Sequence, residues 1–456
     1  MSKRGLARLA LAVVALIVTG CTLNRPADPV VLTGAQLPAL SSVAAGDVVA
    51  FRWVNGWDQV PIQVDERKDV NFTTVYNGAI SANFVTTVYA DPGTFTGADA
   101  NANVDADDEV VFMAKDVGLE APSDATGPAG VVAGSGAKVK VRSSLGGADR
   151  DGWIYLFKRS GGLSPGAGES YVSYDFQLLS GAYKTTYKLQ DGPNPENTTV
   201  STPYYAGHFS DRWLNDQLKV KAGDASEVDI LDRHKALLAP GNCGRSEDTF
   251  DDAEGAFVTN KAGPVRAIRS YVGANSGPLT QREHIFYEQR QDVRTFLRVH
   301  SGIPGPIDFF DYSAAAVGMK YRNNANTGGV TIDGAPDTVT AAQLAWESVD
   351  GPQGGLSMAH SFTTDIPGLV ASSFYFDDST PGGGAETQCT GDAQAIGQSG
   401  PWVRTNPLPN TDPRTTPFNS LTSTRTIYFE EPGKADGAAR SAQAASPFQL
   451  TVSSLP

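Results

Sequence analysis

The sequence has few basic residues, few histidines and few cysteines. Its 456 residues include 36 Lys and Arg against 50 Asp and Glu, which gives a net charge of −14. A protein this acidic repels phosphate backbones and anionic lipid headgroups, so nucleic acid is excluded as a partner. The five histidines show no H-E-x-x-H or H-x-H spacing, which argues against a histidine-based metal centre.

Long apolar runs are also missing after the first twenty residues. The run near the N-terminus, Leu9–Val18, is ten residues long and follows the basic residues Lys3, Arg4 and Arg8. Ten apolar residues are too few to cross a bilayer, but a basic segment followed by a short apolar core is typical of a signal peptide. We therefore assign residues 1–20 to a signal peptide that is absent from the fold.

The end of this segment, Val18-Thr19-Gly20-Cys21, resembles the lipobox of bacterial lipoproteins. The resemblance implies that Cys21 is diacylated and becomes the first residue after cleavage. It also implies a protein held to the cell envelope through its lipid, outside the cytoplasm. Residue 22 is Thr instead of the Asp that retains some lipoproteins at the inner membrane, which indicates the outer membrane in a Gram-negative organism. The alternative is an ordinary secretory signal with a chance cysteine.

The two remaining cysteines, Cys243 and Cys389, both lie in Gly-rich segments of an exported chain. An oxidising compartment allows them to form a disulfide, which would stabilise the fold by about 4–5 kcal/mol in the chain-entropy model. The alternative is a catalytic thiolate. Without Lys3, Arg4 and Arg8, 33 basic residues face 50 acidic ones, so the mature chain has a net charge of −17.

Helical periodicity is scarce, and alternating strand patterns recur throughout the chain. Runs such as "FVTTVYA", "KVKVRSS", "GWIYLFKR" and "STRTIYFEE" are rich in Val, Ile, Thr and aromatic residues. Helical spacing is found in residues 229–239, where Ile230, His234, Leu237 and Leu238 fall on one face. The sequence predicts an all-β protein of two antiparallel β-sandwich domains with few short helices.

Composition divides the full chain, signal peptide included, into four parts. Residues 1–20 are the signal peptide, and residues 21–46 are small and polar enough to form a lipidated tether. The most linker-like interior stretch is 189–203. We therefore expect a first sandwich over 47–188 and a second, larger one over 204–456.

A hairpin is predicted near the start of the first domain. Asn55-Gly56 suits a two-residue type I′ turn, in which both central residues have positive φ. Pairing outward from this turn places Phe51 opposite Val60 on a buried face. Trp57 then lies on the opposite face, where it is a candidate for stacking against a ligand.

The segment 96–112 is dense in oxygen-bearing side chains. Alternate positions of this kind resemble the first ligands of an EF-hand-type loop for Ca²⁺, although Val104 and Val110 stand where that loop needs Gly and a bidentate Glu. The alternative is a polar turn in which Asp105 and Asp108 imitate a capping box. The candidate metal ligands are Asp99, Asn101, Asn103, Asp105, Asp107 and Asp108.

One cluster suggests catalysis. In "REHIFYEQR" and "TFLRVHS", alternation directs Arg282, His284, Arg298 and His300 to one face of what we expect to be neighbouring strands. On an open sheet face, arginine could neutralise a uronate while histidine moves a proton. The alternative is a solvated sheet face with cross-strand pairs.

Together these features predict an envelope-anchored lipoprotein that binds or processes carbohydrate or a similar polar polymer. If it is an enzyme, a polysaccharide lyase or glycoside hydrolase fits best. The alternative is a non-catalytic structural or adhesion lipoprotein, because sandwiches host many unrelated functions. The sequence leaves the oligomeric state open.

Overall fold

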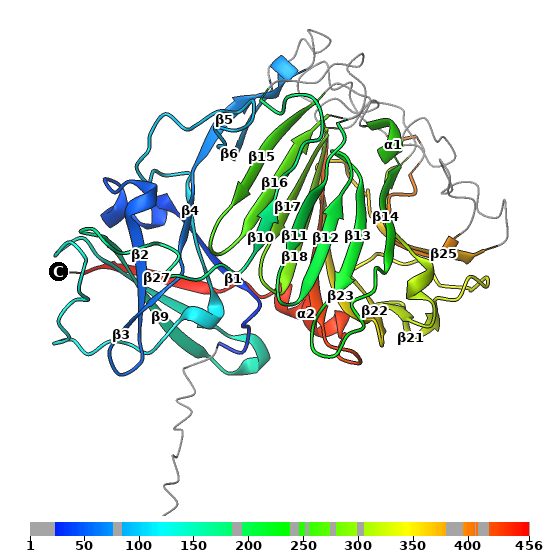
Figure 1. Ribbon diagram of the computed structural model, residues 1–456. Helices are drawn as coiled ribbons and strands as arrows, with labels where there is room; N and C mark the ends of the chain where they lie inside the picture. The colour runs from blue at the N-terminus through cyan, green and yellow to red at the C-terminus, as the bar shows by residue number, and fades with distance from the viewer. Residues whose placement is uncertain are drawn as a thin grey trace, which may run out of the picture.

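The fold was obtained as a computed structural model (Figure 1). The residues it describes are 23–75, 84–184, 194–237, 246–250, 255–273, 280–298, 305–379, 395–405, 407–408 and 419–455. Every strand pairing is antiparallel, which confirms the predicted all-β class with few short helices. Within these residues no helix is both long enough and apolar enough to cross a membrane.

The smaller unit is a sandwich of two sheets. Its three-stranded sheet has the order β1 (Pro29–Thr33), β7 (Glu109–Met113) and β4 (Gln63–Asp65). Its five-stranded sheet has the order β27 (Gln449–Ser454), β8 (Ala137–Ser143), β9 (Arg150–Lys158), β2 (Val48–Trp53) and β3 (Trp57–Val60). Val30, Val110, Val139, Ile154 and Leu156 belong to the core between them.

The segment expected to form a tether is part of this sandwich. Residues 29–33 are β1, which pairs with β7. Leu23 is 2% exposed, and Leu37, Leu40 and Val43 are buried in the same core. The tether prediction is therefore wrong from Leu23 onward, because the apolar residues among the small and polar ones have a core to enter.

The C-terminal strand also belongs to the smaller unit. β27 pairs with β8 along its whole length, from Gln449 opposite Arg142 to Ser454 opposite Ala137. Figure 1 shows this red strand running back beside the blue and cyan strands of the N-terminal part. The larger unit is thus inserted between β9 and β27, and the expected boundaries of 47–188 and 204–456 do not describe two consecutive sandwiches.

The larger unit is built on one nine-stranded sheet. Its strand order, β15-β16-β17-β18-β26-β23-β22-β20-β21, places β17 beside β18 as expected. The bounds are β15 Ala256–Ala262, β16 Ala267–Val272, β17 Gln281–Phe286, β18 Arg290–Arg298, β26 Ser420–Glu430, β23 Gly354–Thr364, β22 Trp346–Gly351, β20 Lys320–Asn323 and β21 Asn326–Thr331.

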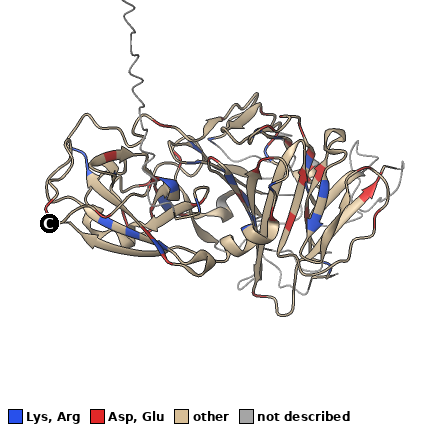
Figure 2. Ribbon diagram, turned by 90° about the horizontal axis from the view of Figure 1, so that it is seen from below, with Lys and Arg blue, Asp and Glu red and all other residues tan. Residues whose placement is uncertain are grey.

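Two four-stranded sheets cover the inner face of the nine-stranded sheet. The core between these two layers includes Tyr205, Phe286, Phe310, Met358 and Phe429. The first has the order β10 (Ser173–Asp175), β11 (Thr198–Ser201), β12 (Tyr205–Phe209) and β13 (Asn215–Val220). The second has the order β14 (Leu231–Leu237), β19 (Ile307–Tyr312), β25 (Ala395–Trp402) and β24 (Ser372–Asp378). Figure 2 shows acidic and basic residues interspersed along the strands rather than separated into blocks.

The predicted helix over 229–239 is a strand, β14, over most of its length. His234, Lys235, Ala236 and Leu237 are all buried, because this strand is covered on both faces. A strand of that kind shows no alternation, so its apolar residues can match a helical spacing by chance. The described α-helices are α1 (Glu247–Phe250) and α2 (Gly437–Ala444). Short 3₁₀ turns occur at η1 (Gly34–Gln36), η2 (Pro38–Leu40), η3 (Ala45–Asp47), η4 (Phe72–Val75), η5 (Ala114–Asp116), η6 (Leu145–Gly147) and η9 (Ala314–Ala316).

The two units share a buried junction. Val111 and Met113 of β7 pack against Ile268 and Ile285 on the outer face of the nine-stranded sheet. At the edge of this apolar contact, Arg266 donates to Asp65 Oδ2 and Glu109 Oε2 at 2.8 Å each. A hairpin of β5 (Arg67–Asn71) and β6 (Val85–Tyr89) extends the contact over β15 and β16. Burying a charge is tolerated only when it is paired, so the junction is specified by both packing and charge.

Candidate functional site

The outer face of the five-stranded sheet carries a group of aromatic side chains. Along β9, Ile154 and Leu156 point into the sandwich core, so the alternate residues Tyr155 and Phe157 point outward. On a solvated sheet face, outward residues are ordinarily polar. Tyr155 and Phe157 are 2% and 6% exposed, because residues from other segments, including Ala121, Val131, Leu163 and Leu455, pack over this face.

Trp57 joins this group, but through a different hairpin register from the one expected. The observed pairs are Phe51 with Gln59 and Trp53 with Trp57, so the loop contains three residues, Val54–Gly56. Asn55 has φ +101°, a conformation that Asn tolerates better than most residues. A shift of one residue moves every side chain to the other face. Phe51 consequently lies on the outer face beside Trp57; it is buried as expected, but on the same face as Trp57 and not on the opposite one.

The aromatic rings hold one another in edge-to-face contacts. The centroid of the Trp57 ring lies 4.9 Å from that of Tyr155, at an interplanar angle of 81°, and 6.2 Å from that of Phe157. The Trp57 indole N–H donates to the carbonyl oxygen of Thr126 at 2.6 Å. Because both the ring contacts and this hydrogen bond fix the indole, Trp57 presents a preorganised surface.

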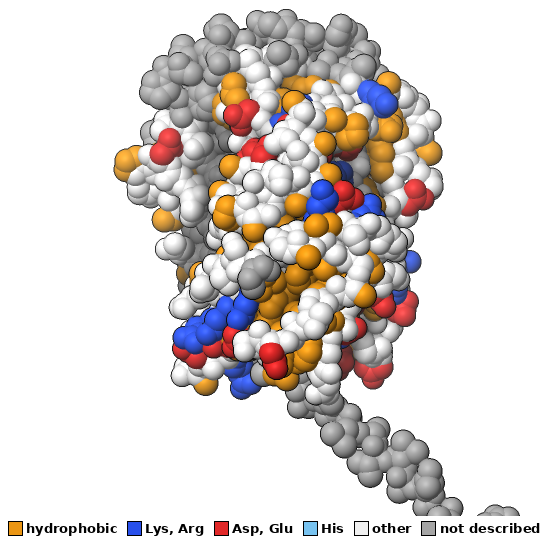
Figure 3. All heavy atoms as spheres, turned by 90° about the vertical axis from the view of Figure 1, so that its left-hand side faces the viewer, with side chains coloured by type: hydrophobic (Ala, Val, Ile, Leu, Met, Phe, Trp, Pro, Cys, Tyr) orange, Lys and Arg blue, Asp and Glu red, His pale blue; other side chains and the backbone are white. Residues whose placement is uncertain are grey.

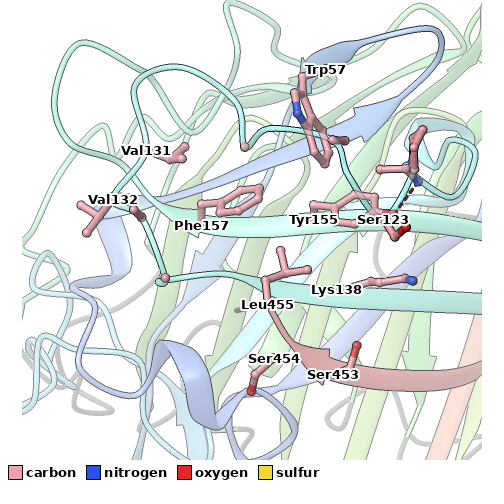
Figure 4. A pocket seen from close by; sticks show the side chains of 16 residues that line it. Trp57, Ser123, Val131, Val132, Lys138, Tyr155, Phe157, Ser453, Ser454 and Leu455 are labelled. Atoms are coloured by element: carbon pink, nitrogen blue, oxygen red, sulfur yellow. Dashed lines mark hydrogen bonds between the residues drawn. The ribbon is translucent and has the colours of Figure 1, made fainter.

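These rings line a cavity of about 480 Å³. Figure 4 shows Trp57 at its rim, with Tyr155 and Phe157 along its floor and Lys138 and Leu455 beside them. Figure 3, which views this end of the molecule, shows hydrophobic side chains gathered in a hollow with charged side chains around it. A pocket of this size with an apolar floor and a few polar groups is typical of small-ligand sites. We call it the aromatic groove; its other lining residues are Ala121, Pro122, Ser123, Ala125, Gly127, Val131, Val132, Ala133, Gly134, Ser453 and Ser454.

Polar groups lie at defined points around the aromatic groove. Lys138 forms an ion pair with Glu120, and the side chain of Lys138 remains 26% exposed. The backbone N–H of Ala121 donates to the Tyr155 hydroxyl oxygen at 2.7 Å. Burial raises the pKa of Tyr155, so its hydroxyl stays protonated and can donate in turn. The groove can thus offer both hydroxyl and ammonium donors to a polar ligand.

Arg282 and His284 do not lie on an open sheet face. Each is 1% exposed, because the inner face of β17 is covered by the four-stranded sheets. Arg282 pairs with Asp308, and its Nε donates to Thr295 Oγ1 at 3.1 Å. His284 contacts the Tyr271 hydroxyl and the Gln291 amide, both at 3.1 Å. The alternation was read correctly, but the face that it defines is interior.

A histidine that the sequence did not single out for chemistry completes this interior cluster. The Nε2 atom of His234 lies 2.7 Å from Asp308 Oδ1 and 3.2 Å from Arg425 Nη1. Burial, together with the nearby Arg282 and Arg425, lowers the pKa of His234 to about 4 against the opposing effect of Asp308. Burial also lowers the pKa of His284 well below its usual value. Both rings are therefore neutral at neutral pH.

Of the two other predicted catalytic residues, the structure describes the backbone of Arg298 alone. The backbone of Arg298 pairs with that of Ser420 at the end of β18. His300 lies outside the described residues, as do Cys21, Cys243 and Cys389. The predicted lipidation and the predicted disulfide therefore stay predictions.

The acidic stretch forms a hydrogen-bonded turn against the N-terminal 3₁₀ segment. Asp108 accepts from the backbone N–H of Asp105 at 3.0 Å and from that of Arg67 at 2.9 Å. Asp99 and Asn101 accept from the backbone N–H groups two residues further along, at 3.0 and 3.2 Å. These hydrogen bonds are the ones expected for a polar turn. The bond from Asp105 N–H to the Asp108 carboxylate is one of the two bonds of a capping box, although a strand follows here instead of a helix.

The same stretch does not present a formed ligand shell. Within the described residues, no group of three or more His, Cys, Asp or Glu side chains is positioned to hold a metal ion. Asn103 pairs with Ala44 in an isolated bridge, and Asn101 Nδ2 donates to Asp105 Oδ2 at 3.1 Å. Burial raises the pKa of Asp107 to about 6, and the adjacent carboxyl of Asp105 adds to this effect.

Comparison with known proteins adds little beyond the fold. A scan against protein-family models gives no match, and a search of curated proteins gives none. Among solved structures, the chain is similar to a proposed aldose 1-epimerase from Escherichia coli K12, with a TM-score of 0.31 and 12% sequence identity. The likeness covers 57% of this chain and 100% of that one. A likeness at this level carries no argument about activity, so the function rests on the residues of the site.

Sequence reasoning proposed Trp57 as a candidate stacking residue but missed the other residues of the groove. The signal was present in "GWIYLFKR", where Trp153, Tyr155 and Phe157 alternate with Ile154 and Leu156. Only one face of the five-stranded sheet packs on the sandwich core. Because this strand is apolar on both faces, its other face is expected to be covered as well. The contribution of Ser453 and Leu455 had no such signal, because it depends on the long-range pairing of β27 with β8.

Proposed function

We propose that this protein is an envelope-anchored lipoprotein that binds carbohydrate in the aromatic groove. The observation that carries the proposal is the fixed indole of Trp57 at the rim of a cavity floored by Tyr155 and Phe157. The face of an aromatic ring carries partial negative charge and attracts the polarised C–H groups of a sugar ring. Side chains of Lys138, Ser453 and Ser454 supply donors and acceptors for hydroxyl groups at the edge.

The shape of the groove favours a neutral or weakly anionic saccharide. Its floor is apolar, whereas the chain as a whole is strongly acidic and repels highly charged polyanions. Lys138 is the cation that lines it, and Glu120 already neutralises that charge in part. We therefore expect recognition through stacking and hydroxyl hydrogen bonds more than through charge.

The proposal is tested by binding of the chain from Thr22 onward to a glycan array and to soluble polysaccharides. Trp57→Ala should weaken binding of any captured glycan by at least tenfold, or about 1.4 kcal/mol, as expected for a central aromatic contact. Isothermal titration calorimetry on the captured glycan measures this change.

Trp153→Ala is the matched control. Trp153 lies on the same strand and the same sheet face as Tyr155 but does not line the cavity. Its removal should leave the affinity unchanged. Equal losses in both variants, or no glycan bound by the parent, would overturn the proposed function.

A further inference from the structure

The aromatic groove has two ends of different polarity. Figure 4 shows aliphatic and aromatic side chains toward one end, and side chains with hydroxyl or ammonium groups toward the other. The first are Val131, Val132 and Phe157, and the second are Tyr155, Ser123 and Lys138. Tyr155 and Phe157 are alternate residues of β9, so the two ends lie roughly 7 Å apart along that strand. A ligand that fills the groove therefore contacts both kinds of surface.

The apolar end is a continuous hydrocarbon surface. Val131, Phe157 and Leu455 pack in one cluster. Leu455 and Phe157 approach each other over Gly136, where a Cβ atom would lie 2.7 Å from a side-chain carbon of each. Val132 lines the cavity and is 38% exposed, so its methyl groups are accessible from the groove. The walls at this end thus offer hydrocarbon contacts to a ligand.

The backbone groups at the apolar end are already hydrogen-bonded within the protein. The Val132 N–H donates to the carbonyl oxygen of Lys158 at 2.8 Å, and the Val132 carbonyl oxygen accepts from Ser135 Oγ at 2.6 Å. The Leu455 N–H donates to the carbonyl oxygen of Gly136 at 2.8 Å. A sugar hydroxyl placed here would give up its hydrogen bonds to water and find these groups occupied, which is costly. This end of the groove therefore favours an apolar substituent.

The polar end has the opposite character. The Tyr155 hydroxyl oxygen accepts from the Ala121 N–H at 2.7 Å, and no acceptor for its own proton is found among the described residues. Lys138 lies directly opposite Tyr155 in the sheet, and its side chain is 26% exposed beside Glu120. Sugar hydroxyl groups accept hydrogen bonds from both kinds of donor. The hydroxyl groups of a sugar therefore have partners at this end.

We propose that the aromatic groove selects carbohydrates that carry a methyl group on the sugar. The sugar ring lies against Trp57, and its hydroxyl groups face Tyr155 and Lys138. The methyl group packs against Val132 and Leu455, where its burial is favourable. Sugars carry methyl groups in acetyl substituents and at deoxy positions, and both present the same chemistry to the apolar end.

The substituent is a short one. A longer acyl chain would extend past Val132, which borders solvent, and would gain no further burial. The inference rests on the proposed function, because it names the class of carbohydrate that the same groove takes.

The test measures binding of two matched pairs of sugars to the chain from Thr22 onward by isothermal titration calorimetry. Triacetylchitotriose and cellotriose differ in acetamido against hydroxyl groups at C2, whereas L-fucose and L-galactose differ in methyl against hydroxymethyl at C5. The methyl-bearing member of at least one pair should bind at least tenfold more tightly, since one methylene in an apolar pocket discriminates by about 10–200-fold. The pair that shows the preference identifies the source of the methyl group.

Val132→Thr places a hydroxyl where the apolar end has a methyl group and keeps the shape of the side chain. It should reduce the preference within the pair by roughly fivefold or more, and leave the affinity for the hydroxyl-bearing member unchanged. Val85→Thr is the matched control, because Val85 is an exposed valine of β6 that does not line the groove. Thermal melting establishes that both variants are folded.

The result is separable from that of the carbohydrate-binding proposal. Equal affinities within both pairs, in a protein that captures glycans through Trp57, would overturn the selection and retain the proposed function. An undiminished preference in folded Val132→Thr would also overturn the selection. A parent protein that binds no glycan would remove both proposals.

Discussion

At the scale of single residues, the buried charged cluster between the sheets ties stability to pH. His234, Asp308, Arg282 and Arg425 contact one another in the interior, where an unpaired charge would be costly. The neutral state of His234 is the one that fits, since two guanidinium groups already neutralise Asp308. Protonating the ring would add a charge that has no further partner to offset it.

We therefore expect His234 to destabilise the fold in acid. Its pKa falls from about 6.5 in the unfolded chain to about 4 in the folded one, so the unfolded state binds more protons between these values. The stability that depends on the neutral ring is complete above pH 6.5 and is lost as the pH falls towards 4. The loss from this group amounts to roughly 3 kcal/mol.

Urea unfolding of the parent and of His234→Gln across this pH range measures the effect. The difference in unfolding free energy between the two should shrink by that amount from pH 7 to pH 4. Other groups, such as Asp311, whose pKa burial raises to about 6, change stability in the opposite sense but do so in both proteins. Parallel pH profiles would show that His234 does not titrate as inferred.

The same residues mark the limit of prediction from the sequence. Alternation correctly grouped Arg282 with His284 and correctly paired β17 with β18. Whether a polar face of a strand is solvated or buried depends on what packs on it, and that layer comes from β14 and β19, which lie elsewhere in the chain. Charge in a strand is usually a sign of solvent, so an interior network of this kind is hard to anticipate.

At the scale of elements, the position of a turn was predicted more accurately than the register of the strands that it joins. The Asn55-Gly56 hairpin was predicted in place, yet a loop with one more residue than expected moved the side chains of β2, but not those of β3, to the face opposite the predicted one. Trp57 lies on the predicted face, where Phe51 joins it, and its role in stacking stays a prediction. Register is fixed by the neighbouring strand β9 and by the core, neither of which a short stretch of sequence reveals.

The acidic turn gives a prediction at this scale. We retain the prediction that this turn binds Ca²⁺, because the carboxyl groups of Asp105 and Asp107 crowd one another and a bound cation would offset their repulsion. Ligand binding to the native state raises the melting temperature by mass action. The melting temperature in millimolar Ca²⁺ should therefore exceed that in a chelator, and Asp107→Asn should abolish the difference.

A melting temperature that does not respond to Ca²⁺ would favour the alternative of a polar turn closed by Asp108. Asp58→Asn serves as the control, since Asp58 is an exposed carboxylate paired with Arg52 outside this stretch. Under the polar-turn alternative, neither variant should change the response to the cation.

At the scale of the whole molecule, the proposed lipid anchor would fix how close the fold lies to a membrane. Leu23 is part of the core, so only Thr22 separates it from the cysteine that we propose to be lipidated. The lipid would then hold the smaller unit directly against the bilayer surface, with no flexible linker between them. The aromatic groove belongs to this unit, which would keep a captured glycan close to the membrane.

Cys21→Ser tests the anchor in the organism that makes the protein. The variant should move from the membrane fraction to the soluble extracytoplasmic fraction, because serine lacks the thiol to which the proposed lipid is attached. A release detected by immunoblotting after fractionation supports the anchor. Unchanged association with the membrane would contradict it.

The pairing of β27 with β8 has a consequence for how the chain is made. Synthesis proceeds from the N-terminus, so β8 is made about three hundred residues before its partner β27. Until β27 is made, one edge of β8 stays unpaired. An open edge invites pairing with other chains, and charged side chains, lysine above all, discourage this. Lys138, Lys140 and Arg142 alternate along that edge. We expect these positive charges, which lie beside the groove, to discourage aggregation of the nascent protein until β27 has been synthesised.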